Sequence, residues 1–271
     1  MLRVTVLGSG TSTGVPVPAC DCPVCLSGDP KNDRLRSSVL IEAISDLGAI
    51  LCSLLVDTSV DLRQQCLRYK IPKVDAVIYT HCHADHVFGL DDLRAFNFVS
   101  GGSIPVYASP DTAPKLRETF PYAFKTQKHY PGGSPPQLNM KIIEHGQSFL
   151  VAGSNFDLEV MPLLVLHGSL PVTALRIGDF AYLTDCSAIP EESIKHLFGL
   201  DVLILDGLRE RPHLTHFNHA QAVEAIETIK PKKTYLTHLS HEVDYERGNL
   251  SLRKMTHLSV ELAYDGLIIE V

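Results

Sequence analysis

The stretch Thr80-His81-Cys82-His83-Ala84-Asp85-His86 decides the fold of this chain and carries much of its chemistry. It follows the apolar run Val77-Ile78-Tyr79, which is typical of a buried strand. In an extended turn, His81 and His83 project to the same side because side chains alternate with period two, whereas Asp85 and His86 are neighbours and must diverge. Any one of these histidines could be an ordinary loop residue. As a unit, the motif predicts a metal site and favours two ions over one.

Length and composition predict one large α/β domain without a membrane segment. The chain has 271 residues, of which 45% are apolar, and this is enough for a substantial core. It has no run of about 18 uncharged apolar residues, and its N-terminus reads as a strand and a glycine-rich turn, so a cytoplasmic protein is expected. The net charge of −7 provides no general basic field for a long polyanion, which argues against nucleic acid as a partner.

The apolar runs predict strands in both halves of the chain, with helices between them. Strands are expected over Leu2 to Leu7, Ser37 to Ala43, Ala49 to Val56, Val74 to Tyr79, Ile104 to Tyr107, Met140 to Glu144, Ser148 to Val151, Phe156 to Met161, Leu163 to Leu166, Thr173 to Ile177, Phe180 to Thr184, Val202 to Leu205, Thr234 to Leu236 and Leu267 to Val271. Helices are expected over Val60 to Tyr69, Gly89 to Phe98, Glu191 to Phe198 and Ala220 to Ile229, the last with Asn218 as its N-cap. This order predicts two sheets packed face to face with helices outside.

Two segments have more than one interpretation. The loop Gly8 to Gly14 could offer backbone N–H groups to an anion, or it could be a turn that needs glycine, because no lysine follows it as a P-loop requires. The region from 110 to 138 interleaves basic and aromatic residues. That pattern is typical of a substrate lid or a nucleic-acid arm, and an excursion that packs a dimer fits it equally well.

Metal-binding side chains recur at the ends of the predicted strands. They are His81, His83, Asp85, His86, His167, Asp185 and His238. Strand ends gather along one edge of a sheet, so we expect these groups to converge. Asp57 also ends a strand, where it could hold a ligating histidine in place or act as a helix N-terminal acid. Four other histidines have no partner at ligand spacing and are expected to be exposed to solvent: His129, His145, His196 and His257.

The segment 20–25, Cys20-Asp21-Cys22-Pro23-Val24-Cys25, predicts a second metal site. Its three thiolates have Cys-x-Cys-x-x-Cys spacing, and a tetrahedral zinc needs a fourth ligand. His241 lies three residues after His238, so on an extended backbone the two imidazoles face opposite ways. A structural zinc held by Cys20, Cys22, Cys25 and His241 would tie the N-terminal loop to the last motif. Three reduced surface thiols are the alternative.

The order of these motifs resembles the metallo-β-lactamase superfamily, whose hydrolases pair His-x-His-x-Asp-His with a later histidine, a later aspartate and a final histidine. The resemblance implies a four-layer αββα sandwich in a single domain over residues 1–271. It implies one metal ion held by His81, His83 and His167, a second held by Asp85, His86 and His238, and Asp185 as the bridge between them. Zinc, manganese, iron and nickel all suit such mixed ligands.

The cysteine cluster together with Thr237-His238-Leu239-Ser240-His241 is similar to the PhnP-like branch, which contains a cyclic phosphodiesterase. This resemblance implies a homodimer that cleaves a small phosphodiester, which could be cyclic, by attack of a metal-bridging hydroxide. It also implies His216 as the general acid, with His213 and His219 as the other candidates. Three functions remain as alternatives: a tRNA 3′-end endonuclease, a thioester or lactone hydrolase, and a non-catalytic binding protein on the same fold.

Overall fold

The computed structural model of the chain describes residues 1–124, 133–154 and 156–271, and in this part its strands form two seven-stranded sheets. The first has the order β14-β1-β2-β3-β4-β5-β6 and the second β13-β12-β11-β10-β9-β8-β7. The strands of the first sheet are β1 (Leu2–Gly8), β2 (Ser38–Ile44), β3 (Ile50–Val56), β4 (Ala76–Ile78), β5 (Ile104–Ala108), β6 (Leu138–Ile142) and β14 (Ile268–Glu270). Those of the second are β7 (Phe149–Ala152), β8 (Asp157–His167), β9 (Leu170–Ile177), β10 (Phe180–Leu183), β11 (Val202–Asp206), β12 (Lys233–Thr237) and β13 (Val260–Leu262).

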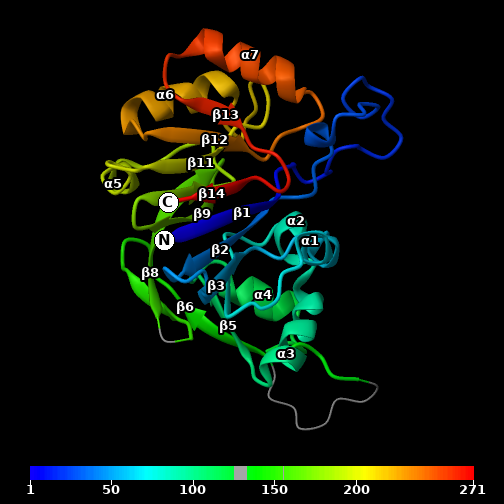
Figure 1. The fold of residues 1–271 in the computed structure, drawn as a ribbon, viewed down its shortest axis with the longest axis vertical. Helices are drawn as coiled ribbons and strands as arrows, with labels where there is room; N and C mark the ends of the chain where they lie inside the picture. The colour runs from blue at the N-terminus through cyan, green and yellow to red at the C-terminus, as the bar shows by residue number, and fades with distance from the viewer. Residues whose placement is uncertain (125–132, 155) are drawn as a thin grey trace.

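Helices cover the outer face of each sheet, so the molecule has the four layers of an αββα sandwich (Figure 1). The helices are α1 (Leu62–Tyr69), α2 (Ala84–Val87), α3 (Arg94–Ser100), α4 (Ala113–Thr119), α5 (Glu191–Ile194), α6 (His219–Ile229) and α7 (Tyr245–Met255), with short 3₁₀ turns at Pro30–Asn32 and Leu90–Leu93. Helices α1 to α4 belong to the first sheet, and α6 and α7 lie over the second (Figure 1). The predicted fold class is confirmed.

The alternation of apolar side chains explains why these strands pack on both faces. In β11, Val202 and Ile204 enter the core between the sheets, whereas Leu203 and Leu205 pack under the outer helices. A strand that is buried on both faces has a continuous apolar sequence, and the strand sequences of this chain have this form. The result is three apolar cores, one between the sheets and one under each helical layer.

The parallel parts of the two sheets bring several strand ends to one edge. Strands β3 to β6 are parallel in the first sheet, and β10 to β13 are parallel in the second. The backbone N–H of Thr173 in β9 donates to the carbonyl of Thr80 at 2.9 Å, which joins the second sheet to the motif loop after β4. The carboxyl ends of parallel strands are where α/β proteins place their sites.

Several predicted elements differ from those observed. The two strands expected over 156–161 and 163–166 are one strand, β8, which runs through Pro162. Its partner β7 pairs only as far as Val160, so the missing N–H of Pro162 interrupts no ladder on that side. The helix expected from Gly89 is a 3₁₀ turn followed by α3, and α5 is shorter than expected. Helix α7 and strand β13 were not predicted.

Several backbone N–H groups of the loop Gly8 to Gly14 donate hydrogen bonds to other parts of the protein. Ser9 N–H donates to the Asp265 carboxylate at 2.8 Å, Gly10 N–H to the Leu35 carbonyl at 2.8 Å and Thr11 N–H to the Leu239 carbonyl at 3.2 Å. The interpretation as a structural turn therefore holds, and the anion-binding interpretation is wrong for these donors. In the region 110–138, residues 113–119 form α4, and 125–132 lie outside the described residues.

Candidate metal centre

The motif after β4 changes from extended backbone to helix in its middle. His83 is extended, with φ −66° and ψ 149°, and it precedes helix α2, which carries Asp85 and His86. The expectation of an extended turn is therefore wrong beyond His83, because a helical turn begins at Ala84. The rings of His81 and His83 still meet edge to face with centroids 4.5 Å apart.

One group of possible ligands contains His81, His83 and Asp185, whose ligand atoms all lie within 4.8 Å of one another. The His81 Nε2 atom is 3.6 Å from the Asp185 Oδ2 atom. His167 stands beside this group, with its ring centroid 5.1 Å from that of His83 and 5.9 Å from that of His81. The His167 Nδ1 atom is bonded to the Thr215 carbonyl, which orients the ring.

A second group contains Asp85, His86, Asp185 and His238, all of them buried. The Asp185 Oδ1 atom lies 3.4 Å from His86 Nε2 and 3.2 Å from His238 Nε2, and Asp85 Oδ2 lies 3.4 Å from His86 Nε2. Asp185 is thus common to both groups, with one oxygen directed to each. A carboxylate has two oxygens, so it suits a position between two cations.

Unpaired buried nitrogens show that these groups fit cations. The Nε2 atoms of His81, His86 and His238 are buried and find no hydrogen-bond partner among the described residues. A buried polar atom without a partner costs free energy, and a metal ion bound to the lone pair removes that cost. The donor set of imidazole and carboxylate matches zinc, manganese and similar divalent ions.

The protonation of the groups supports the same conclusion. Burial, and then the neighbouring His86, hold the pKa of His81 well below its usual range, so its imidazole is neutral and able to bind metal. Burial alone would lower the pKa of His86, but the Asp185 and Asp57 carboxylates raise it well above its usual range. Burial alone would raise the pKa of Asp185, yet His238 and His86 hold it well below its usual range. The buried carboxylates attract positive charge, and metal ions would supply it.

Asp57, just after β3, forms hydrogen bonds that position the motif after β4. Its Oδ2 atom lies 2.7 Å from His86 Nδ1 and accepts the Thr80 hydroxyl at 2.8 Å, and its Oδ1 atom accepts the Thr80 backbone N–H at 2.8 Å. The same Thr80 hydroxyl lies 2.9 Å from His81 Nδ1. Asp57 therefore orients one histidine directly and a second one through Thr80.

His216 lies against the metal groups, with its ring 4.4 Å from that of His167 and 4.7 Å from that of His238. Its Nδ1 atom is 2.7 Å from the Asp206 Oδ2 atom. Asp206 was not singled out from the sequence, although it ends an apolar strand as the other acids of the site do. The same oxygen accepts the Cys186 N–H at 2.8 Å, which fixes the carboxylate.

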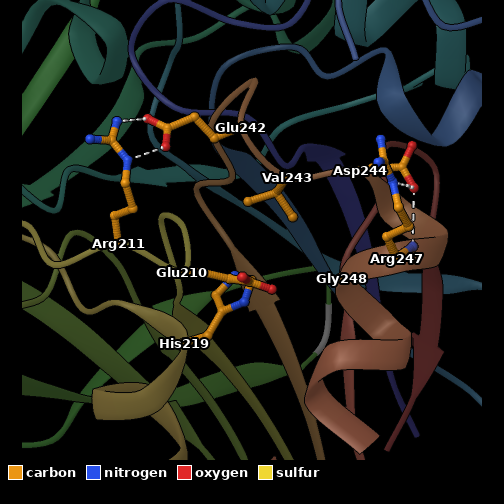
Figure 2. A pocket seen from close by; sticks show the side chains of 8 residues that line it. All are labelled: Glu210, Arg211, His219, Glu242, Val243, Asp244, Arg247 and Gly248. Atoms are coloured by element: carbon orange, nitrogen blue, oxygen red, sulfur yellow. Dashed lines mark hydrogen bonds and ion pairs between the residues drawn. The ribbon is translucent and has the colours of Figure 1, made fainter. Parts of the chain in front are cut away.

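The other two candidate acids lie in different surroundings. The ring of His213 is exposed and 5.1 Å from that of His216. His219 is buried at the start of α6, and its ring nitrogens make no hydrogen bond of good geometry among the described residues. It lines a pocket of about 380 Å³ beside Glu242 and α7 (Figure 2). Its position beside the metal groups therefore favours His216 over His213 and His219 as the candidate general acid.

The cysteine cluster is assembled around His241. The His241 Nδ1 atom lies 3.3 Å from the Cys20 sulfur, 3.6 Å from that of Cys22 and 3.7 Å from that of Cys25. The Cys25 N–H lowers the pKa of Cys22 to about 6, whereas burial raises that of Cys25 to about 11. Three sulfurs and one imidazole nitrogen form the donor set of a structural zinc. The backbone before His241 is not extended as expected, since His238 has φ 59°.

The remaining histidines are partly as expected. His257 is exposed, His129 lies outside the described residues, and His196 is half-buried. His145 is also half-buried, with its Nε2 atom 3.0 Å from the Thr173 hydroxyl, so the expectation of an exposed residue is wrong for both His145 and His196. Within the described ranges, none of the helices has the length and apolar content needed to cross a membrane.

Residues 53–239 match the family model described as a beta-lactamase superfamily domain. Together with the αββα fold and the buried His/Asp groups, this match shows that the chain belongs to the metallo-β-lactamase superfamily and has the site of a metallohydrolase. Within the superfamily it belongs to the PhnP-like branch. The solved structure described as a new diphosphatase from the PhnP family is 39% identical, with a TM-score of 0.85, over 100% of this chain and 98% of that one.

Two further relatives are informative. The octanoyltransferase of Porphyromonas gingivalis is 41% identical over 216 residues, which are 79% of this chain but 41% of that protein. The chain thus spans about two fifths of the length of this curated relative. The Zn²⁺-bound PqqB of Methylobacterium extorquens is 20% identical with a TM-score of 0.75, over 99% of this chain and 100% of that one, and it shows the same fold.

Proposed function

We propose that this protein is a dinuclear metal-dependent hydrolase that cleaves a small phosphodiester. The observation that supports this most strongly is the position of Asp185, whose two oxygens face two separate groups of histidines. Beside them, His216 lies within hydrogen-bond distance of a buried carboxylate. This combination provides what hydrolysis of a phosphodiester needs, namely a place for the phosphoryl oxygens and a proton donor for the departing oxygen.

The proposed ligands are those expected from the sequence. His81, His83 and His167 would hold one ion; Asp85, His86 and His238 would hold the other; Asp185 would serve both. Bound divalent ions lower the pKa of water and offset negative charge on a phosphoryl oxygen. Manganese and zinc fit these ligands, as iron and nickel do, and a third ion, zinc, would occupy the cysteine cluster.

The chain's own residues account for the proton transfers. As the oxygen of water bonds to phosphorus and releases a proton to solvent, the bond between phosphorus and the leaving oxygen breaks, and His216 donates its Nε2 proton to that oxygen, which departs as an alcohol. Asp206 keeps the Nδ1 proton in place and stabilises the charged imidazole before the transfer. His216 then recovers a proton from solvent. A positioned acid of this kind contributes about 10² to 10⁴ in rate.

Hydrolysis of bis(p-nitrophenyl) phosphate tests the proposal. Protein purified without chelator and supplied with Mn²⁺ should release nitrophenolate, and Asp185→Ala should abolish the release. Asp201→Ala is the matched control, because Asp201 forms a surface ion pair with Lys232 and precedes β11, at the end of that strand opposite to Asp206. Metal analysis should find up to three ions per wild-type chain. If wild type binds metal but turns over no phosphodiester, the proposal is wrong.

Thioester hydrolysis is the second candidate, and one observation favours it. The curated relative that is 41% identical carries the name of an octanoyl-transferring enzyme. A carbonyl group can be attacked at the same site, so an octanoyl thioester belongs in the same assay. Turnover of the thioester without any phosphodiesterase activity would establish this candidate, and metal binding without either activity would indicate a binding protein.

Precursor tRNA is the substrate that tests the endonuclease alternative. The net charge of −7 opposes binding of a long polyanion, so we propose that no cleavage at its 3′ end occurs. We also propose that the protein is a cytoplasmic homodimer, and light scattering of the metal-loaded protein measures its oligomeric state.

A further inference from the structure

His167 is the last residue of β8 and stands at the tip of a β-hairpin. It pairs with Leu170, the first residue of β9, so Gly168 and Ser169 form the turn between the two strands. Gly168 has φ 63°, a left-handed conformation that glycine adopts without strain. Its backbone N–H lies beyond the last pair of the ladder. Contacts from outside the hairpin therefore decide how firmly this proposed ligand is held.

The segment directly after Asp185 supplies such contacts. The Ser187 hydroxyl accepts the Gly168 N–H at 2.9 Å and donates to the Leu166 carbonyl at 3.0 Å. One side chain thus bonds to the residue before His167 and to the residue after it. Because Ser187 is two residues from Asp185, these bonds also join the hairpin tip to the backbone that carries the shared carboxylate.

The same segment contacts the loop that carries the proposed proton donor. The Phe217 N–H donates to the Cys186 carbonyl at 2.7 Å. In the same loop, the Thr215 carbonyl is bonded to the His167 ring, and a Cβ atom on Gly168 would lie 2.9 Å from Thr215 Cγ2. The hairpin tip, this loop and the segment after the shared carboxylate therefore meet at one place beside the metal groups.

We propose that Ser187 is a positioning residue for the first metal ion, because its hydroxyl fixes the backbone on both sides of His167. This inference rests on the proposed function, in which His167 is a ligand of that ion. The Thr215 carbonyl orients the ring of this histidine, and Ser187 holds the main chain from which the ring projects. Contacts that orient a metal ligand contribute about 10- to 100-fold to metal affinity.

The effect should be confined to the first ion. The ligands of the second ion come from α2 and from the segment after β12, and neither belongs to the hairpin. Asp185 serves both ions, but the residue after it has a separate support, because the Cys186 N–H donates to the buried Asp206 carboxylate at 2.8 Å. That support does not involve the Ser187 hydroxyl. Loss of the hydroxyl should therefore leave Asp185 and the second ion in place.

Metal titration of Ser187→Ala tests the inference. Protein cleared of loosely held metal by a mild chelator is titrated with Mn²⁺ in competition with a chelating dye. Wild type should bind two ions, and Ser187→Ala should bind one of them with unchanged affinity and the other about 10- to 100-fold more weakly. The variant should fold, because the Leu166 N–H still donates to the Ala188 carbonyl at 2.9 Å.

Ser193→Ala is the matched control. Ser193 is also buried, and its hydroxyl donates at 2.6 Å to the Leu164 carbonyl, on the same strand but two residues before Leu166. Both variants lose a serine hydroxyl that bonds to a carbonyl of β8, so their melting temperatures should fall by similar amounts. Only Ser187→Ala should lose metal affinity, because only Ser187 bonds on both sides of His167.

Double variants assign the affected ion. His83→Ala removes a proposed ligand of the first ion, and His238→Ala removes one of the second. Adding Ser187→Ala to His83→Ala should change the affinity for the remaining ion by less than about twofold. Adding it to His238→Ala should weaken the remaining ion by the full 10- to 100-fold.

Three results would overturn the inference while the proposed function stands. They are wild-type affinity for both ions in Ser187→Ala, equal weakening of both ions in that variant, and an equal loss of affinity in Ser193→Ala. If wild type binds fewer than two ions outside the cysteine cluster, the proposed function itself fails, and the inference fails with it.

Discussion

Replacing Asp206 with asparagine should remove the proton donor's contribution and leave the fold intact. Asp206 is fully buried, and its Oδ2 atom lies 2.7 Å from His216 Nδ1 and accepts the Cys186 N–H at 2.8 Å. Asparagine has nearly the same volume and keeps one oxygen as acceptor, but it cannot stabilise a charged imidazole. A positioned acid is worth about 10² to 10⁴. We therefore expect kcat to fall about 10²-fold for an ester with a poor, alkoxide leaving group.

The assay compares that substrate with one whose leaving group needs no proton. For a cyclic alkyl phosphodiester the loss should be about 10²-fold, whereas for methyl 4-nitrophenyl phosphate it should stay below about threefold. Metal content must be measured on both proteins, because ligand atoms of Asp206 and His216 lie within 4.8 Å of those of Asp185 and His238. An equal loss on both substrates at unchanged metal content would refute the role given to His216. Adding His216→Gln to Asp206→Asn should cost little more, because both residues act as one unit.

Three further predictions concern metal binding and stability. Asp57→Ala should weaken metal binding about 10- to 100-fold, measured by competition with a chelating dye, because His86 loses the carboxylate that orients it. Cys20→Ser should lose one zinc ion per chain and lower the melting temperature, whereas Cys66→Ser, outside the cluster, should keep the zinc. Arg211, followed by Arg209, lowers the pKa of Glu242 from 4.5 to about 2, so its stabilisation is present above pH 4.5 and is lost as the pH falls towards 2. Solvent screening of this partly exposed group leaves about 1 kcal/mol in all. Between pH 6 and pH 3, wild type should therefore lose about half of that amount more unfolding free energy than Glu242→Gln, measured with urea.

The sheets could be predicted from the sequence because their strands are buried on both faces. Helix α7 could not, and Gly248 in its middle shows why. A Cβ atom there would lie 2.6 Å from the Leu262 side chain, so the helix needs glycine to pack closely on β13. A rule based on helix propensity counts the same glycine against a helix. The close contact exists only in the folded structure, so the local sequence gives no sign of it.

The candidate site also has residues that could be predicted from the sequence and residues that could not. Its metal-binding side chains could be predicted because their types and spacing are chemically distinctive and they follow apolar strands. The Thr215 carbonyl that orients His167 could not, since every residue carries a carbonyl. Similarly, Thr80 reads as an ordinary residue of the motif, although its hydroxyl bonds both to Asp57 and to His81. Contacts made by the backbone or by a common hydroxyl leave no pattern in the sequence.

Asp57 and Asp206 show how one local arrangement can serve two purposes. Each lies at the end of an interior strand, β3 or β11, and each is fully buried. Each has an imidazole Nδ1 atom at 2.7 Å and accepts a backbone N–H at 2.8 Å from the segment that follows the neighbouring parallel strand, Thr80 in one sheet and Cys186 in the other.

The Asp57–His86 and Asp206–His216 pairs differ in the surroundings of the imidazole Nε2 atom. The Nε2 atom of His86 is buried against the Asp85 and Asp185 carboxylates, where a cation fits. The ring of His216 adjoins that of the exposed His213, and we propose that its Nε2 atom serves the substrate. Both carboxylates hold an imidazole Nδ1 atom at 2.7 Å. Loss of Asp57 should appear as lower metal affinity and lower activity on every substrate. Loss of Asp206 should instead appear as a dependence on the leaving group at full metal occupancy. The same defect for both variants would mean that His216 is a further metal ligand and that the proton donor lies elsewhere.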